Sequence, residues 1–238
     1  MIRVIVNGAF GRMGLVTQEA IKQSDDLELV AALGRKDNLA EEIKKHDAEV
    51  VVDFTLPDTV FSNTQTIIKA GARPVVGTSG LTLEQVSALE KDCTENNVGG
   101  IIAPNFSVGA ILMMRYAEDA VKYFPHAEII EMHHEKKVDA PSGTAVKTAQ
   151  LMAANRDCKE SIDHAAAARG EAHENIPVHS VRLPGLFAHQ VVMFGGNGET
   201  LTIKHDSMDR SSMMPGVCLA CRKVMDVDRL IYGLENFI

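Results

Sequence analysis

Two adjacent histidines and a nearby lysine lie in the middle of the sequence, in the segment HHEKKVDAPSGTA that begins at His133. Lys137 follows His133 by four residues, so a turn brings the imidazole and the ammonium group within reach of each other. Both groups exchange protons in enzymes, and no serine or cysteine nucleophile is evident beside them. The pair therefore indicates proton transfer to an imine or a carbon centre, not acyl transfer.

A zinc site is the first alternative for the same histidines. The metalloprotease motif H-E-x-x-H needs a second histidine four residues after the first, and here His134-Glu135 is followed by Val138 at that position. Cys218 and Cys221 form a lone C-x-x-C with no second pair, and we interpret them as helix packing residues. No metal site is predicted.

A segment suited to anion binding follows the lysine. Asp139-Ala-Pro leads into Ser142-Gly143-Thr144, which opens a predicted helix. The hydroxyls of Ser142 and Thr144 can cap that helix, and the backbone N–H groups around Gly143 then face outward as a carboxylate site. Proton-transfer groups followed by an anion site predict an enzyme that acts on a small carboxylate.

The elements that must position these residues follow two patterns. Over the first hundred residues, apolar strand patterns alternate with helix patterns. Strands are expected at 2–7, 27–33, 49–54, 74–80 and 98–104, with helices that include 58–70 and 83–96. This alternation predicts an α/β fold with a parallel, doubly wound sheet.

The pattern changes after residue 105. A long helix is expected over 108–124, then a strand over 127–134 that ends in the two histidines, and a surface loop or weak helix over 161–176. Short strands at 178–185, 189–196 and 199–207 are typical of an antiparallel meander, and the last 25 residues return to a helical pattern. We therefore predict a dinucleotide-binding domain over 1–105, completed by 213–238, with an inserted α+β domain over 106–212.

A glycine turn lies between the first strand and the first helix. Its sequence is GAFGRMG, from Gly8 to Gly14. Gly8 lets the chain turn tightly, Gly11 lets the backbone approach a pyrophosphate at the helix N-terminus, and Gly14 lets the helix pack on the sheet. The spacing departs from the usual G-x-G-x-x-G, and such turns also occur without a ligand; the position on the first βα unit favours dinucleotide binding.

The end of the second strand carries cations and lacks the acid that usually binds the adenosine ribose. The sequence there is Leu33-Gly34-Arg35-Lys36. A guanidinium can pair with the 2′-phosphate of NADPH, and the missing carboxylate removes a repulsion. The alternative is a solvated Arg-Lys pair in a loop.

Composition excludes several other classes of protein. The net charge of -8 argues against a nucleic-acid partner. No apolar run reaches the roughly 18 residues of a membrane span, and the N-terminus lacks the features of a secretory signal. We expect a cytoplasmic protein with no membrane partner.

The chain resembles the 4-hydroxy-tetrahydrodipicolinate reductase (dihydrodipicolinate reductase) family of the bacterial diaminopimelate/lysine pathway. HHEKKVDAPSGTA resembles the signature of that family, and GAFGRMG resembles its glycine loop. VVGTSGL, APNFSVG and the strands from SVRLPG to ETLTIKHDS resemble further segments, so the similarity runs the length of the chain. The resemblance implies a Rossmann-type parallel sheet and an inserted α+β substrate and oligomerisation domain with a mixed sheet.

The resemblance also assigns roles to particular residues. His133 would be the acid/base residue and Lys137 the proton donor in the reduction of a cyclic unsaturated imine by hydride transfer. The dicarboxylate would be held by His134, Ser142, Gly143 and Thr144. Three segments would line the dinucleotide-binding site. They are Gly8, Ala9, Phe10, Gly11, Arg12 and Met13; Gly77, Thr78 and Ser79; and Ala103, Pro104, Asn105 and Phe106.

Arg35 matches the 2′-phosphate contact of the family, whereas Gly34 replaces the acid common just before it. We therefore expect NADPH to be preferred over NADH. The family also implies a homotetramer joined through the sheets of the substrate domain. Two alternatives stay open on this plan: a dinucleotide sensor that has lost the reaction, and another dehydrogenase with a catalytic set of its own.

Overall fold

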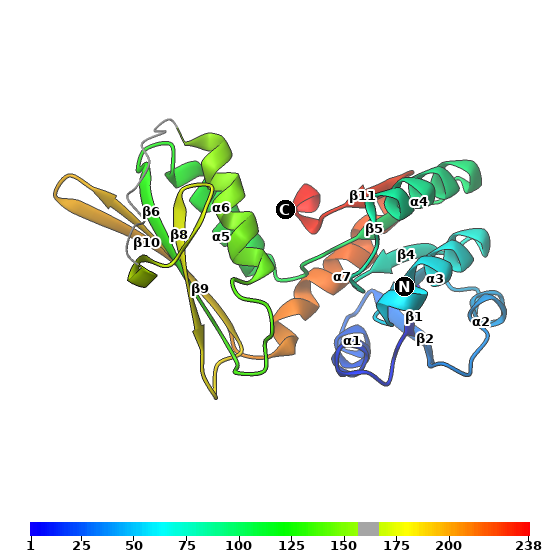
Figure 1. Ribbon diagram of the computed structural model, residues 1–238. Helices are drawn as coiled ribbons and strands as arrows, with labels where there is room; N and C mark the ends of the chain where they lie inside the picture. Colours follow the sequence, from blue (N-terminus) through cyan, green and yellow to red (C-terminus); the bar gives the residue numbers. More distant parts are fainter. Residues whose placement is uncertain (157–166) are drawn as a thin grey trace. The chain divides into compact units, whose positions relative to one another are not determined.

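The computed structural model describes residues 1–156 and 167–238. Two compact units make up the chain, one from Met1–Val108 with Arg210–Ile238 and the other from Gly109–Asp209 (Figure 1). The predicted loop or weak helix over 161–176 lies partly outside the described residues. Its described part holds the 3₁₀ helix η1 (Ala167–Arg169) and strand β7 (Glu171–His173).

The first unit is built on a six-stranded sheet in the order β11-β5-β4-β3-β1-β2, and every neighbouring pair is parallel. Its strands are β1 (Ile2–Asn7), β2 (Leu27–Leu33), β3 (Val50–Asp53), β4 (Arg73–Val76), β5 (Gly100–Ile102) and β11 (Leu230–Tyr232). Its helices are α1 (Arg12–Lys22), α2 (Leu39–Lys45), α3 (Pro57–Lys69), α4 (Leu83–Asn96) and α7 (Met214–Lys223), with 3₁₀ helices η2 (Arg210–Met213), η3 (Val224–Asp226) and η4 (Leu234–Phe237). The predicted parallel α/β fold is confirmed.

The apolar strands explain why this sheet forms. Val4, Ile5 and Val6 of β1 are buried, as are all the valines of β3 and β4, as a sheet covered on both faces requires. Separate core clusters pack around Ile5 and Val51 with α3, and around Val76 and Ile102 with α4. This core fixes the carboxyl ends of the strands, where the glycine turn lies.

The C-terminal segment differs from the prediction of helix alone. After α7, the chain adds β11, which pairs in parallel with β5 through Leu230↔Gly100 and Ile231↔Ile101. A strand of three residues is too short to show a period of two, so the sequence pattern did not reveal it. Cys218 and Cys221 are buried on α7, in agreement with a packing role.

The second unit holds a mixed sheet in the order β10-β9-β6-β8-β7. Besides β7, its strands are β6 (His126–His133), β8 (Ile176–Arg182), β9 (Ala188–Gly196) and β10 (Glu199–Ser207). Helices α5 (Val108–Ala120) and α6 (Gly143–Asn155) pack on the sheet through a core that includes Ala117, Ile129, Ala149, Val192 and Phe194. The predicted mixed sheet is confirmed.

The expected meander is only partly right. β9 and β10 form an antiparallel hairpin, but β6 lies between β8 and β9, parallel to the first and antiparallel to the second. The side chains of Ala127, Ile129 and Glu131 are all buried, which a central strand allows and an edge strand does not. Turn signals in the sequence show where a hairpin lies, but they do not show that β6 pairs with both β8 and β9. In the described part of the chain, no helix is long and apolar enough to cross a bilayer.

Candidate active site

The glycine turn after β1 has a geometry that only glycine permits at two positions. Gly8 has φ +78°, and a Cβ there would lie 2.3 Å from the carbonyl oxygen of Phe54. A Cβ on Gly14 would lie 2.3 Å from the carbonyl oxygen of Gly8. A side chain at Gly8 would push the turn away from the residue that follows β3, and one at Gly14 would push α1 away from the turn. The two glycines therefore keep the turn tight.

The turn also shows which amides are left for an anion. The N–H groups of Gly8 and Ala9 both donate to the carbonyl oxygen of Leu33 at 3.0 Å, and that of Gly11 donates to Gly8 at 3.1 Å. The first N–H groups of a helix have no partner inside the helix, and here they begin at Arg12 and Met13. The amides left for an anion are therefore those of the first turn of α1.

A cavity of about 660 Å³ opens beside this turn. Four predicted cofactor positions line it: Gly8, Phe10, Gly11 and Arg35. Its other walls come from Asn7, Gly34, Asp37, Leu39, Phe54, Thr55, Leu56, Thr59 and Asn63. Ala9 is buried, Arg12 is exposed and Met13 is half-buried, and none of these three lines the cavity.

The end of β2 carries an acid that the sequence analysis missed. Asp37 folds back so that its Oδ2 accepts a hydrogen bond of 2.7 Å from the N–H of Gly34. Asp37 and Arg35 both line the cavity, and the Phe10 ring packs against Gly34. The edge of the cavity therefore has one carboxylate and one guanidinium where the sequence indicated cations alone.

A buried carboxylate organises the far side of the cavity. Asp53, at the end of β3, is fully buried, and its Oδ2 accepts from the amides of Asn7 (2.9 Å) and Asn63 (3.1 Å). Its Oδ1 accepts from the hydroxyls of Thr55 (2.6 Å) and Thr78 (2.9 Å). Because three of these donors also line the cavity, Asp53 orders that wall and joins it to the predicted cofactor residue Thr78.

The other predicted cofactor positions gather at the ends of β4 and β5. A Cβ on Gly77 would lie 2.2 Å from the Phe54 ring and 2.7 Å from the Phe106 ring, which meet edge to face with centroids 5.7 Å apart. Ala103 is buried and its N–H donates to Val76 at 2.9 Å. Ser79 and Pro104 are exposed, and Asn105 is half-buried. These residues lie at the same end of the sheet as the cavity, although they do not line it.

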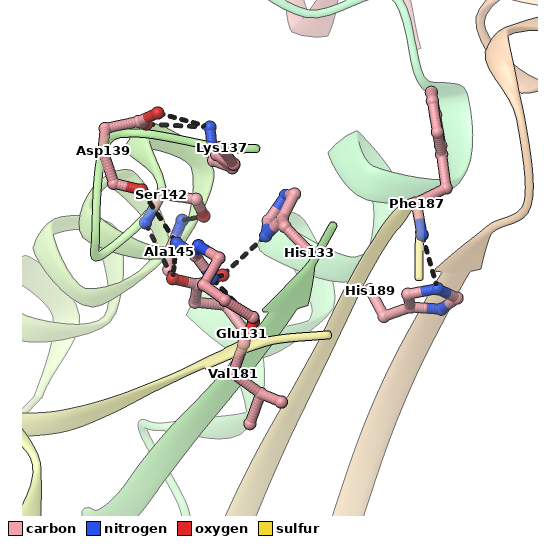
Figure 2. A network of polar contacts seen from close by, with 10 residues as sticks. Glu131, His133, Lys137, Asp139, Ser142, Ala145, Val181, Phe187 and His189 are labelled. Atoms are coloured by element: carbon pink, nitrogen blue, oxygen red, sulfur yellow. Dashed lines mark hydrogen bonds and ion pairs between the residues drawn. The ribbon is translucent and has the colours of Figure 1, made fainter. Parts of the chain in front are cut away.

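In the second unit, His133 ends β6 and lies against a buried acid. Its Nδ1 lies 2.6 Å from Oε2 of Glu131, and its side chain is 14% exposed (Figure 2). The ring is therefore held from one side and open on the other. His134, the next residue, is half-buried, and its carbonyl oxygen accepts from the N–H of Lys137 at 3.1 Å.

The predicted turn brings Lys137 back toward the end of β6, but its ammonium group bonds to an acid. Lys137 Nζ lies 2.8 Å from both carboxylate oxygens of Asp139, as Figure 2 shows. The hydrogen bond from Lys137 is the main cause that lowers the pKa of the Asp139 carboxyl. The Asp139 side chain is 60% exposed and that of Lys137 is 22% exposed, so the carboxylate side of the pair faces solvent.

The start of α6 matches the predicted anion site with one change. Ser142 is the N-cap, and its hydroxyl accepts from the N–H of Ala145 at 3.2 Å. Thr144 lies inside the helix and does not cap it; its hydroxyl makes no hydrogen bond within the described residues. A Cβ on Gly143 would meet nothing within 4 Å. The helix start is open, with an unused hydroxyl beside it.

The sequence analysis missed several polar residues that hold these sites in place. Arg182 of β8 pairs with Glu131, and Asp53 bonds the walls of the cofactor cavity. The bonds from Arg182 to Glu131 and from Asn7 to Asp53 join residues 51 and 46 positions apart, so only the order of the strands could have revealed these two contacts.

A parallel sheet with a glycine turn after its first strand, and a cavity at the carboxyl ends of its strands, is the architecture of the dinucleotide-dependent oxidoreductases. Residues 2–106 match the family described as dihydrodipicolinate reductase, N-terminus, and residues 109–238 match dihydrodipicolinate reductase, C-terminus. The chain belongs to the dihydrodipicolinate reductase family, as its sequence motifs predicted.

Individual relatives agree over the full length. A 4-hydroxy-tetrahydrodipicolinate reductase of Coxiella burnetii (strain Dugway 5J108-111) is 58% identical over 237 residues, which are 100% of this chain and 99% of the relative. The Legionella pneumophila (strain Lens) protein of the same name is 52% identical over 240 residues, covering 99% of each chain. A solved structure of dipicolinate-bound dihydrodipicolinate reductase from Paenisporosarcina sp. TG-14 has a TM-score of 0.90 and 42% identity, with both chains fully covered.

Proposed function

We propose that this chain reduces 4-hydroxy-tetrahydrodipicolinate to tetrahydrodipicolinate with NAD(P)H, as a cytoplasmic step of diaminopimelate and lysine biosynthesis. The observation that carries this proposal is the end of β6, where His133, the turn with Lys137 and the open start of α6 come together. The relative from Paenisporosarcina sp. TG-14 binds dipicolinate, a planar dicarboxylate that resembles the substrate.

The reaction adds a hydride and a proton, two electrons and two protons in all, to an unsaturated ring. Loss of water from the hydroxy substrate leaves a cyclic imine conjugated with a carbon–carbon double bond. The dinucleotide, when bound, supplies a hydride to C4 of this ring, and the electron pair of the double bond moves toward the nitrogen. The neighbouring enamine carbon then takes a proton, and tetrahydrodipicolinate leaves.

The residues of the chain supply binding and the proton. Lys137 places a positive charge where negative charge develops on the substrate, and it gives the proton; His133 acts as the acid/base residue. His134, Ser142, Gly143 and Thr144 hold the dicarboxylate at the positive end of the α6 dipole. The glycine turn and the first turn of α1 hold the pyrophosphate.

Steady-state kinetics with the hydroxy substrate test this proposal. NAD(P)H should be consumed, and tetrahydrodipicolinate should accumulate in equal amount. A chain that binds dipicolinate and NADPH but consumes no NADPH would be a dinucleotide sensor, and the proposed reaction would be wrong.

Replacing Thr144 with valine tests the carboxylate site. The hydroxyl that the helix leaves unused is lost, while shape and helix are kept. Binding of pyridine-2,6-dicarboxylate should weaken by roughly 1.5–3 kcal/mol, the value of a hydrogen bond to a charged group. Titration calorimetry measures this, and Thr66→Val, at a half-buried threonine of α3 in the first unit, is the control. Unchanged affinity in Thr144→Val would place the carboxylate elsewhere.

NADPH is the cofactor that we propose as preferred, with NADH as the second. Arg35 is exposed at the cavity edge, where a 2′-phosphate can reach it. Asp37, which shares that edge, opposes the preference, because its carboxylate repels a phosphate and can accept a ribose hydroxyl. The two side chains should therefore shift the preference in opposite directions.

Two substitutions test this balance. Arg35→Ala should raise KM for NADPH about fivefold and leave NADH nearly unchanged, since an exposed ion pair contributes roughly 1 kcal/mol. Asp37→Asn should raise the NADPH to NADH ratio of kcat/KM by about two- to fivefold, because asparagine still accepts from Gly34 but does not repel the phosphate. Lys44→Ala removes an exposed cation of α2 as a control. Equal use of both cofactors by the unmodified enzyme, together with no effect of Arg35→Ala, would contradict the assignment.

The open face of the second sheet supports the proposed homotetramer. Helices α5 and α6 pack against one face, and the alternate residues of β6, β8 and β9 point to the other. Ile130, Met132, Val181 and Val191 are half-buried there, and Met193 is 42% exposed. An apolar face of this kind suits contact with further copies of the chain. Light scattering should give the mass of four chains, and a monomeric mass would contradict the proposal.

A further inference from the structure

Glu131 is a buried acid at the end of β6 whose two oxygens are both bonded (Figure 2). Oε1 accepts from Nη2 of Arg182 at 2.7 Å and from the backbone N–H of Ser142 at 3.1 Å. Oε2 accepts from Nη1 of Arg182 at 2.8 Å and lies 2.6 Å from Nδ1 of His133. One carboxylate thus joins the proposed acid/base residue, strand β8 and the N-cap of α6.

The contact with Glu131 decides which nitrogen of His133 carries hydrogen. Burial opposes the ionisation of Glu131, but hydrogen bonds from His133, Arg182 and Ser180 outweigh it and lower the pKa of Glu131 to about 2. An ionised carboxylate has no hydrogen to donate, so His133 Nδ1 must be the donor. Nε2 is then the nitrogen that remains to exchange a proton with a bound molecule.

Arg182 extends the same network to the other proposed catalytic residue. Its Nη2 also donates to the backbone carbonyl oxygen of Asp139 at 2.8 Å, and the Asp139 carboxylate pairs with Lys137. The guanidinium therefore balances the buried charge of Glu131 and anchors the turn that carries Lys137. The charged groups of this network are Glu131 from β6, Arg182 from β8, and Lys137 and Asp139 from the turn after β6.

We infer that Glu131 is a positioning residue for the proposed reaction. Paired with Arg182, it holds His133 with hydrogen on Nδ1. The same pair fixes the turn that carries Lys137 and the start of α6, where the proposed carboxylate site lies. A buried carboxylate beside a histidine acts in this way in hydrolases, where it orients the imidazole and does not itself take the proton. This inference rests on the proposed role of His133.

Glu131→Gln tests the inference with a side chain of nearly the same shape. The amide oxygen pairs with Arg182, so the NH₂ group faces His133 and the ring must carry its hydrogen on Nε2 instead. We expect kcat to fall tenfold or more, because a wrong tautomer of the catalytic histidine lowers kcat in hydrolases by up to about 10⁴-fold. KM for NADPH should stay unchanged.

The control is Glu42→Gln, which neutralises a carboxylate that contacts His46 in the first unit. It should leave kcat and the tautomer of the His133 ring unchanged. If Glu131→Gln does not fold, the double variant with Arg182→Met removes the cation that has lost its carboxylate partner, and it should show the same loss of kcat. A merely structural role would lower the active fraction without changing the tautomer of the His133 ring.

The tautomer itself can be measured without any variant. Nitrogen-15 shifts of the His133 ring in the complete enzyme should show hydrogen on Nδ1 when the ring is neutral, and on Nε2 in Glu131→Gln. A neutral Nε2–H tautomer in the unmodified enzyme would overturn the inference. So would a folded Glu131→Gln enzyme with unchanged kcat. Normal activity of His133→Ala would instead overturn the proposed role of His133.

Discussion

Replacing His133 or Lys137 with alanine should lower kcat by about 10²-fold or more, the usual contribution of a positioned proton-transfer group. His133 is held by Glu131 and Lys137 by Asp139, with 14% and 22% of their side chains exposed. Neither alanine can place a proton or a positive charge at the ring of the substrate. The affinity for NADPH should hardly change, because both residues lie in the second unit and the glycine turn lies in the first. Single-turnover kinetics and NADPH titration measure the two quantities separately.

The chain offers a matched control for each substitution. Lys136→Ala removes the exposed neighbouring cation, and His126→Ala removes an exposed imidazole from the other end of β6. Both should keep kcat near the value of the unmodified enzyme. If His133 and Lys137 act on one proton, the double variant should lose little more than the worse single variant. A single variant with near-normal kcat would remove that residue from the mechanism.

The alternating elements of the first unit could be predicted because each signal is local. The apolar runs at 2–7 and 27–33 and the turn Gly8–Gly14 need no knowledge of distant residues. β11 could not be predicted in this way, because its three residues are defined by pairing with β5. The position of β6 between β8 and β9 could not be predicted either, because the order of strands in a sheet depends on contacts between residues far apart in sequence.

In the candidate site too, residues close in sequence could be predicted, whereas residues brought together by the fold could not. His133, Lys137 and Ser142 are close in sequence, so their types and spacing indicated proton transfer and an anion site. Arg182 is opposite His133 only in the parallel register of β6 and β8, which no local pattern reveals. Asp37 was missed for a related reason: it follows the end of β2 by four residues and reaches the cavity because the turn folds back on Gly34.

The buried network of Glu131 should make the second unit sensitive to acid. The pKa of Glu131 is lowered from 4.5 to about 2 in the folded chain. A lowered carboxyl pKa stabilises the fold above pH 4.5, where the unfolded group is also ionised, and this stability is lost as pH falls toward 2. At about 1.4 kcal/mol for each pKa unit, the full loss is roughly 3 kcal/mol. Exposed carboxyls with lowered pKa values, such as Asp119 and Asp206, add a smaller background.

Comparing the pH dependence of two proteins isolates this contribution. Glu131→Gln cannot titrate at this position, so its free energy of unfolding should be lower at pH 7 but should fall less between pH 5 and pH 3. Denaturant unfolding followed by circular dichroism gives the free energies, and hydrogen exchange of peptides from β6 and β8 assigns the change to the second unit. Glu42→Gln, which alters an acid of the first unit, should leave the exchange of β6 and β8 unaffected. If the unmodified chain and Glu131→Gln lose stability equally over this range, the carboxylate does not carry the acid sensitivity, and its charge is not held by Arg182 and His133 as the geometry requires.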